Sequence, residues 1–108
     1  MIARTMSALA EPHRLRMLER LRSGPQPVGV LASAARLEQP QASKHLRVLR
    51  DAGLVAVTPD GQRRLYALRG APMQELDTWL QRFRANWDAR FERLDQLLAD
   101  NEEDDRED

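Results

Sequence analysis

The sequence has no cysteine and a single lysine, Lys44, among its 108 residues. Without cysteine the chain offers no thiolate for a metal site and no thiol nucleophile. It also has no run of about 18 apolar residues and no leader pattern at its amino end, so no membrane span or signal peptide is predicted. We therefore expect one soluble, cytoplasmic domain.

The charges are segregated along the chain, although the formal net charge is zero. Seven acidic residues and one Arg lie in residues 100–108, which leaves a net charge of +6 on residues 1–99. Arg suits bidentate hydrogen bonds to phosphates and base edges better than Lys does. A GC-rich genome also supplies Arg codons, so the Arg excess alone does not separate nucleic-acid binding from codon usage.

Three short helices are predicted in the first third of the chain. Residues 2–10 form the first helix, which ends near Glu11-Pro12 because proline is tolerated only in the first turn of the next helix. A second, amphipathic helix follows and is stopped by the Ser-Gly-Pro sequence at 23–25. Residues 28–35 predict a third helix, whose small side chains permit close approach of another helix.

A fourth helix is predicted over residues 40–51, after a turn at 37–39. Apolar residues recur at intervals of four and three, which places them on one buried stripe. This stripe consists of Ala42, Leu46 and Leu49. A different, outward and mostly polar face contains Gln41, Lys44 and Val48.

The period of the pattern changes to two after the fourth helix. Residues 54–58 and 63–68 predict two β-strands joined by a Pro-Asp-Gly-Gln turn at 59–62. Arg63 and Arg64 follow directly after the tip of this hairpin.

One long helix is predicted over residues 73–99. Its apolar face would be roughly 40 Å long, more than one small domain can cover. We interpret the excess as a dimer interface made of Leu76, Leu80, Phe83, Trp87, Phe91 and Leu94. Residues 101–108 contain no apolar side chain and are expected to be disordered, so we predict a domain over 1–99 and an acidic tail over 100–108.

Two short helices, a tight turn between them and a basic hairpin are the elements of a winged helix-turn-helix, a mainly α fold with a small β-hairpin. In that fold the second helix enters the major groove of DNA and the wing lies along phosphates. Gln suits adenine edges, Lys and Arg suit guanine or phosphate, and Ser and His can donate to phosphate oxygens. The predicted contacts to double-stranded DNA are Gln39, Gln41, Ser43, Lys44, His45, Arg47, Arg50, Arg63 and Arg64.

Three stretches of the sequence resemble the ArsR family of transcriptional regulators: AEPHRLRML at 10–18, QPQASKHLRVLRDAGLV at 39–55 and GQRRLYAL at 61–68. The resemblance implies a homodimeric repressor whose first and last helices pair and which binds an inverted-repeat operator. A metal-independent branch of this family is similar in its aromatic last helix, here carrying Trp79, Phe83, Trp87 and Phe91.

Two departures from the family pattern bear on function. Glu38 stands before the recognition helix where the family usually has Ser or Thr; it caps a helix less well and brings a negative charge near DNA. Metal-sensing members carry paired Cys in the helix before the recognition helix, or His with carboxylates on the last helix. This chain has no thiolate at 28–31 and no His after residue 45. We therefore expect no metal, no cofactor and no metal response.

Several side chains admit both a functional and a structural explanation. Asp88 and Glu92 are spaced to hold a hard cation, but ion pairs with nearby Arg explain them better. His13 is interpreted as a surface or interface residue, and His45 as a DNA contact. The aromatic stripe of the last helix can line a small-molecule pocket, although packing and dimerisation explain its spacing first.

No enzyme is predicted, because Ser43 and His45 lie two residues apart on a helix and cannot face each other. Two functional classes remain: a DNA-binding repressor, and a winged-helix protein-interaction module that has lost DNA binding. The basic body and the polar face of residues 39–50 favour the repressor, whereas Glu38 and the acidic tail favour the module. The sequence does not identify a small-molecule effector.

Overall fold

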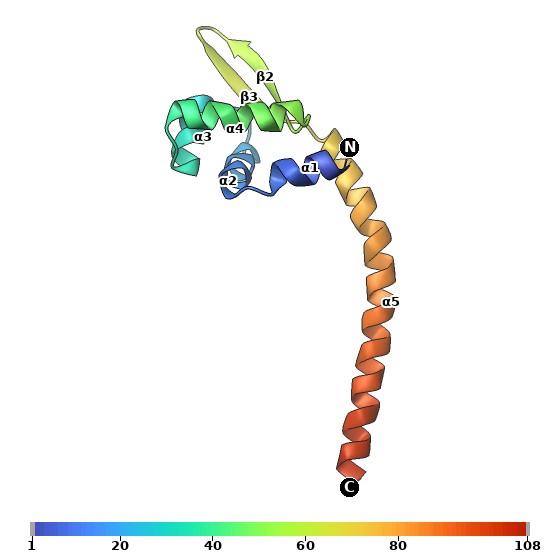
Figure 1. Ribbon diagram of the computed structural model, residues 1–108. Helices are drawn as coiled ribbons and strands as arrows, with labels where there is room; N and C mark the ends of the chain where they lie inside the picture. Colours follow the sequence, from blue (N-terminus) through green and yellow to red (C-terminus); the bar gives the residue numbers. More distant parts are fainter. Residues whose placement is uncertain (1, 108) are drawn as a thin grey trace. The chain divides into compact units, whose positions relative to one another are not determined.

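The computed structural model describes residues 2–107, with side chains for residues 2–101. In this part the chain forms five helices and three strands (Figure 1). They are α1 (Ile2–Leu9), α2 (Pro12–Leu21), β1 (Gln26–Pro27), α3 (Val28–Ala35), α4 (Gln39–Asp51), β2 (Val55–Asp60), β3 (Arg63–Leu68) and α5 (Ala71–Glu107). The chain divides into one compact unit up to Leu76 and a second unit from Asp77, which continues α5.

Helices α3 and α4 end in the same backbone motif. At the end of α4, Gly53 has a φ of 76°, and the N–H of Leu54 donates back to the carbonyl of Leu49 at 2.9 Å. At the end of α3, Arg36 has a φ of 58°, and the N–H of the next residue donates back to the carbonyl of Ala32 at 2.9 Å. These Schellman-type ends satisfy orphan carbonyls and turn the chain sharply, so α3 and α4 form a helix-turn-helix with a short connection.

The three strands form an antiparallel sheet in the order β1-β3-β2. Asp60 pairs with Arg63, so Gly61 and Gln62 alone form the hairpin loop, with Gly61 at a φ of 65°. The turn predicted at 59–62 is therefore too long, because Pro59 belongs to β2. The two-residue strand β1 was not predicted, since only its pairing with β3 makes it a strand.

A single hydrophobic core organises the unit up to Leu76. The predicted stripe of α4 is confirmed, because Ala42, Leu46 and Leu49 are each 0% exposed. The other core residues come from α1, α2, α3 and the start of the hairpin, and the largest fully buried apolar side chains among them are Met17, Leu31, Leu54 and Val55. The outward face of α4 is confirmed as well, since Gln41, Lys44 and Val48 are exposed. Burial on one side fixes which side chains α4 presents on the other.

Helix α5 differs from the prediction at its carboxyl end. It continues to Glu107, eight residues past the predicted end at Ala99, so residues 100–107 are helical where we predicted disorder. No Gly or Pro interrupts the sequence after Pro72, and each further residue of an existing helix adds a hydrogen bond. Asp108 lies outside the described residues. Within the described residues, no helix combines the length and apolar character needed to span a bilayer.

Candidate nucleic-acid interface

A concave groove of about 560 Å³ lies between α4 and β3. Its positively charged lining residues are Lys44, Arg47 and Arg50 from α4 and Arg64 from β3. Ser43, Leu46, Asp51 and Tyr66 complete the lining. Four cations against one carboxylate give the groove a positive potential, which attracts an anion such as a phosphate backbone.

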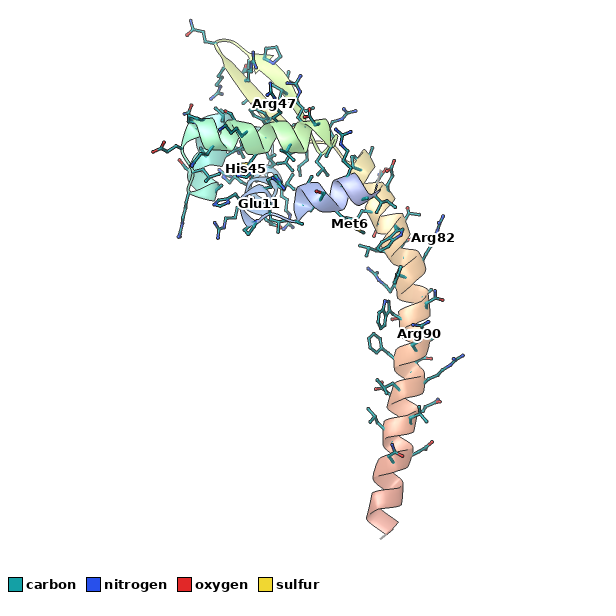
Figure 2. All side chains as sticks on the ribbon, in the orientation of Figure 1. Met6, Glu11, His45, Arg47, Arg82 and Arg90 are labelled. Carbon is teal, nitrogen blue, oxygen red and sulfur yellow. The ribbon has the colours of Figure 1, made fainter. Side chains whose placement is uncertain are left out.

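The burial of one side of α4 explains which residues reach this groove. In Figure 2, Arg47 lies on the side of α4 nearest the β2–β3 hairpin. Six of the predicted DNA contacts on α4 are exposed: Gln39, Gln41, Ser43, Lys44, Arg47 and Arg50. Four of them, Ser43, Lys44, Arg47 and Arg50, line the groove next to the wing, as a winged helix-turn-helix requires.

The first turn of α4 uses one of these residues for its own hydrogen bonding. The backbone N–H of Glu38 donates to Oε1 of Gln41 at 3.4 Å. This contact supplies an acceptor to an amide at the helix start. Gln41 is nevertheless exposed, and its amide nitrogen is the group with which it can donate to a base edge.

Arg63 and Arg64, predicted as equivalent wing contacts, have different surroundings. Successive residues of a strand point to opposite faces, and Arg64 lines the groove beside α4. Arg63 instead borders a separate pocket next to α3, and its Nε donates to Oδ2 of Asp60 at 3.3 Å. Arg64 is therefore the wing residue that shares the groove with the cations of α4.

His45 does not line the groove; it faces the junction between α1 and α2. Its Nδ1 lies 3.3 Å from an Nη of Arg14 and 3.9 Å from Oε2 of Glu11. Its ring stacks on the ring of His13, with a centroid separation of 5.6 Å. Figure 2 shows His45 and Glu11 between α4 and the turn that joins α1 to α2. Because the ring of His45 contacts these neighbours instead of the groove, we do not retain His45 among the proposed DNA contacts.

Glu11 holds this cluster together. As the residue that precedes α2, it accepts the backbone N–H of Arg14 at 2.9 Å, and its Oε1 lies 2.7 Å from Nδ1 of His13. Partial burial raises the pKa of Glu11, but the hydrogen bonds from His13 and Arg14, together with the electrostatic attraction of the two imidazoles, outweigh it and lower the pKa to about 2. Glu11 is therefore ionised at neutral pH.

The residues predicted at a dimer interface lie along α5 with their apolar side chains uncovered. Leu76 is half-buried, whereas the next five are between 41% and 53% exposed: Leu80, Phe83, Trp87, Phe91 and Leu94. Within the helix, Trp87 and Phe91 stack with a centroid separation of 5.2 Å. The described part of the chain therefore leaves a continuous apolar helix face without a partner.

The sequence matches known regulators of transcription. Residues 9–58 match a family model described as a helix-turn-helix domain. The HTH-type transcriptional regulator Rv2034 of Mycobacterium tuberculosis is 40% identical over 102 residues, which are 94% of this chain and 92% of that protein. The HTH-type transcriptional regulator NmtR of the same organism is 44% identical over 75 residues, which are 69% of this chain and 62% of NmtR. The matched segment thus spans less than two thirds of NmtR.

Solved structures of transcriptional regulators resemble the fold of this chain. An ArsR-like transcriptional regulator from Rhodococcus sp. RHA1 has a TM-score of 0.71 and 28% identity, over 89% of this chain and 91% of that one. The homodimeric winged helix-turn-helix DNA-binding domain Mb0332 from Mycobacterium bovis has a TM-score of 0.61 and 27% identity, over 84% of this chain and 82% of that one. The fold is a winged helix-turn-helix, and the class is a DNA-binding regulator of transcription rather than an enzyme. The chain belongs to the ArsR family.

Proposed function

We propose that this chain is a transcriptional repressor that binds an inverted-repeat operator as a homodimer. The basic groove between α4 and β3 is the observation that carries the proposal. It places Lys44 and Arg47 on the helix that enters the major groove in this fold, with Arg64 of the wing beside them.

Two kinds of DNA contact follow from the positions of these side chains. Gln41 and Lys44 lie in the first half of α4, where side chains reach base edges. Arg50 lies near the end of α4 and Arg64 on the wing, and we propose that both hold phosphates. We propose that Gln41 and Lys44 determine the preference for particular DNA sequences. Arg50 and Arg64 then contribute affinity that is the same for every DNA sequence.

The uncovered apolar face of α5 supports dimerisation. A partner helix would bury the exposed rings of Phe83, Trp87 and Phe91, and Mb0332, similar in fold, is described as homodimeric. We propose that α1 and α5 of two copies pair. Half-sites one helical turn apart require the two α4 helices of the dimer to sit about 34 Å apart.

Repression follows from occupancy, since a dimer that covers an operator excludes other proteins from the same DNA. In the metal-sensing members of the family, the metal sites lie on the helix before the recognition helix and on the last helix, which are α3 and α5 here. Residues 28–31 carry no thiolate and α5 carries no His, so we propose that no metal acts through either position.

The alternative is a protein-interaction module, which the negative charge of Glu38 beside α4 favours. DNA binding measured by fluorescence anisotropy on a random duplex separates the two. The repressor binds with an affinity that falls steeply with salt, and a Lys44→Ala, Arg47→Ala, Arg64→Ala variant loses most of that binding. An Arg82→Ala, Arg93→Ala variant is the matched control and keeps it, because helical spacing puts both residues away from the proposed dimer interface of α5. Equal binding by the wild-type chain and the groove variant would support the interaction module.

A further inference from the structure

We propose that Glu11, His13 and His45 form a binding site for one divalent transition ion of the zinc class. One ligand atom from each residue lies within 4.8 Å of the other two. Two imidazoles and one carboxylate are a donor set that suits Zn²⁺, Co²⁺ and Ni²⁺, whereas Mg²⁺ and Ca²⁺ prefer oxygen ligands alone. This site differs from the two metal positions of the family, which lie on α3 and α5. It revises the sequence-based expectation that the chain binds no metal.

The distances within the cluster are close to those that a tetrahedral ion needs. Metal–ligand bonds of about 2.0–2.1 Å place neighbouring ligand atoms roughly 3.3 Å apart. The oxygen of Glu11 is 2.7 Å from Nδ1 of His13, and its other oxygen is 3.9 Å from Nδ1 of His45. The ligand atoms of His13 and His45 lie within 4.8 Å of each other, and the two stacked rings must turn about their side-chain bonds for their lone pairs to converge on one ion.

The hydrogen bonds show that Nδ1 of one imidazole, that of His45, carries a lone pair, which accepts from Arg14 in the structure. Arg14 can only donate, so its contact with His45 at 3.3 Å requires an unprotonated Nδ1 and places the proton of that ring on Nε2. His13 donates from Nδ1 to Glu11, so ion binding through this atom moves its proton to Nε2. An ion bound here therefore takes two neutral imidazoles and one carboxylate as ligands.

Arg14 is the positive charge that opposes the ion. Its Nε donates to the carbonyl of Ala8 at 2.6 Å, and an Nη donates to the carbonyl of Ser7 at 3.2 Å. These two hydrogen bonds hold the guanidinium on the end of α1 when it no longer donates to His45. Binding thus costs Arg14 one hydrogen bond and leaves its other two in place.

The cluster is reachable from solvent. The side chains of His13, Glu11 and His45 are 37%, 24% and 25% exposed, so an ion can enter and keep a water as its fourth ligand. Because His45 lies on α4, a bound ion ties the recognition helix to the α1–α2 junction. None of the three ligands is a proposed DNA contact, so a test of metal binding is independent of a test of DNA binding.

Zinc titration of the full, untagged chain by calorimetry tests the site, with Co²⁺ as a spectroscopic probe. We expect one ion per chain and a Co²⁺ absorption spectrum with nitrogen ligation in a four-coordinate site. His13→Gln, His45→Gln and Glu11→Ser each weaken Zn²⁺ binding by at least about tenfold. The Glu11→Ser substitution keeps a good helix cap, so weaker Zn²⁺ binding by this variant is not caused by misfolding.

An Asp88→Asn, Glu92→Gln variant is the matched control and binds as the wild-type chain does. Loss of Zn²⁺ binding in that variant, or retention of it in the two His variants, would overturn the proposal. So would a wild-type chain that takes up no Co²⁺ or binds it through oxygen alone, and that result is independent of how any variant folds.

Discussion

Arg63 and Asp60 face each other across the tip of the β2–β3 hairpin, where Nε of the arginine donates to the carboxylate at 3.3 Å. The next residue, Arg64, projects from the other face of β3 and lines the groove beside α4. Two adjacent arginines in one strand therefore have different tasks. The ion pair neutralises the first, and the charge of the second adds to those of Lys44, Arg47 and Arg50.

Replacing Arg64 by Ala is expected to weaken specific and non-specific DNA binding together. It lowers the slope of log affinity against log salt by roughly one unit for each phosphate that the side chain no longer neutralises, and the residue occurs twice in a dimer. Arg63→Ala is the matched control and changes the slope less, because Asp60 already pairs with Arg63. Anisotropy titrations at several salt concentrations measure both slopes, and a larger change for Arg63→Ala would contradict this division.

Phe83→Glu or Trp87→Glu is expected to convert a dimer into a monomer. Each places a charge without a partner inside the proposed interface, which is costly. Ala85→Glu is the control, since helical spacing puts residue 85 on the opposite side of α5. Sedimentation velocity at micromolar concentration reports the mass, and a wild-type chain that sediments as a monomer at tens of micromolar would refute the interface.

Glu11→Ala is expected to lower the free energy of unfolding by about 0.5–2 kcal/mol, because it removes the acceptor for the N–H of Arg14 at the start of α2. Glu11→Ser restores an acceptor at that position and recovers most of the stability. Urea denaturation at one fixed protein concentration compares the variants, since the stability of a dimer depends on concentration. Equal stability of the Ala and Ser variants would show that the cap contributes nothing.

Arg36→Gly is expected to stabilise the chain by about 1 kcal/mol. Arg36 occupies the left-handed region at the end of α3, where a side chain costs energy that glycine avoids. Gly29→Ala provides a contrast within the same helix, since its φ is not positive and its new methyl group meets an amide nitrogen of Gln39 at 3.5 Å. A lower thermal midpoint for Arg36→Gly would mean that interactions of the Arg side chain outweigh the backbone cost.

Local patterns in the sequence predicted the helices around the core and the hairpin, because those elements depend on periodicity and on Gly and Pro. The three-residue interval from Ala42 to His45, and the four-residue interval from His45 to Leu49, also place His45 on the inner side of α4. That periodicity is visible in the sequence, and it argues against the DNA contact predicted for this residue.

The cluster around Glu11 was beyond such patterns. It joins Glu11, at the start of α2, to His45, which lies 34 positions later, and only the packing of α2 against α4 brings the two together. The pairing of Arg63 with Asp60 required the register of the hairpin, which a loop placed two residues too early conceals. The first miss concerns a tertiary contact, and the second concerns the boundaries of a turn.

Selection of bound sequences from a pool of random DNA duplexes tests the assignment of this chain as a sequence-specific, dimeric regulator. We expect the wild-type chain to enrich an inverted repeat whose half-site centres lie about one helical turn apart. A Gln41→Ala, Lys44→Ala variant should bind the pool but enrich this repeat weakly, because removal of each base-reading side chain costs about 1–3 kcal/mol of discrimination. Recovery of no common sequence by the wild-type chain, or of the same repeat with equal enrichment by the variant, would contradict the assignment.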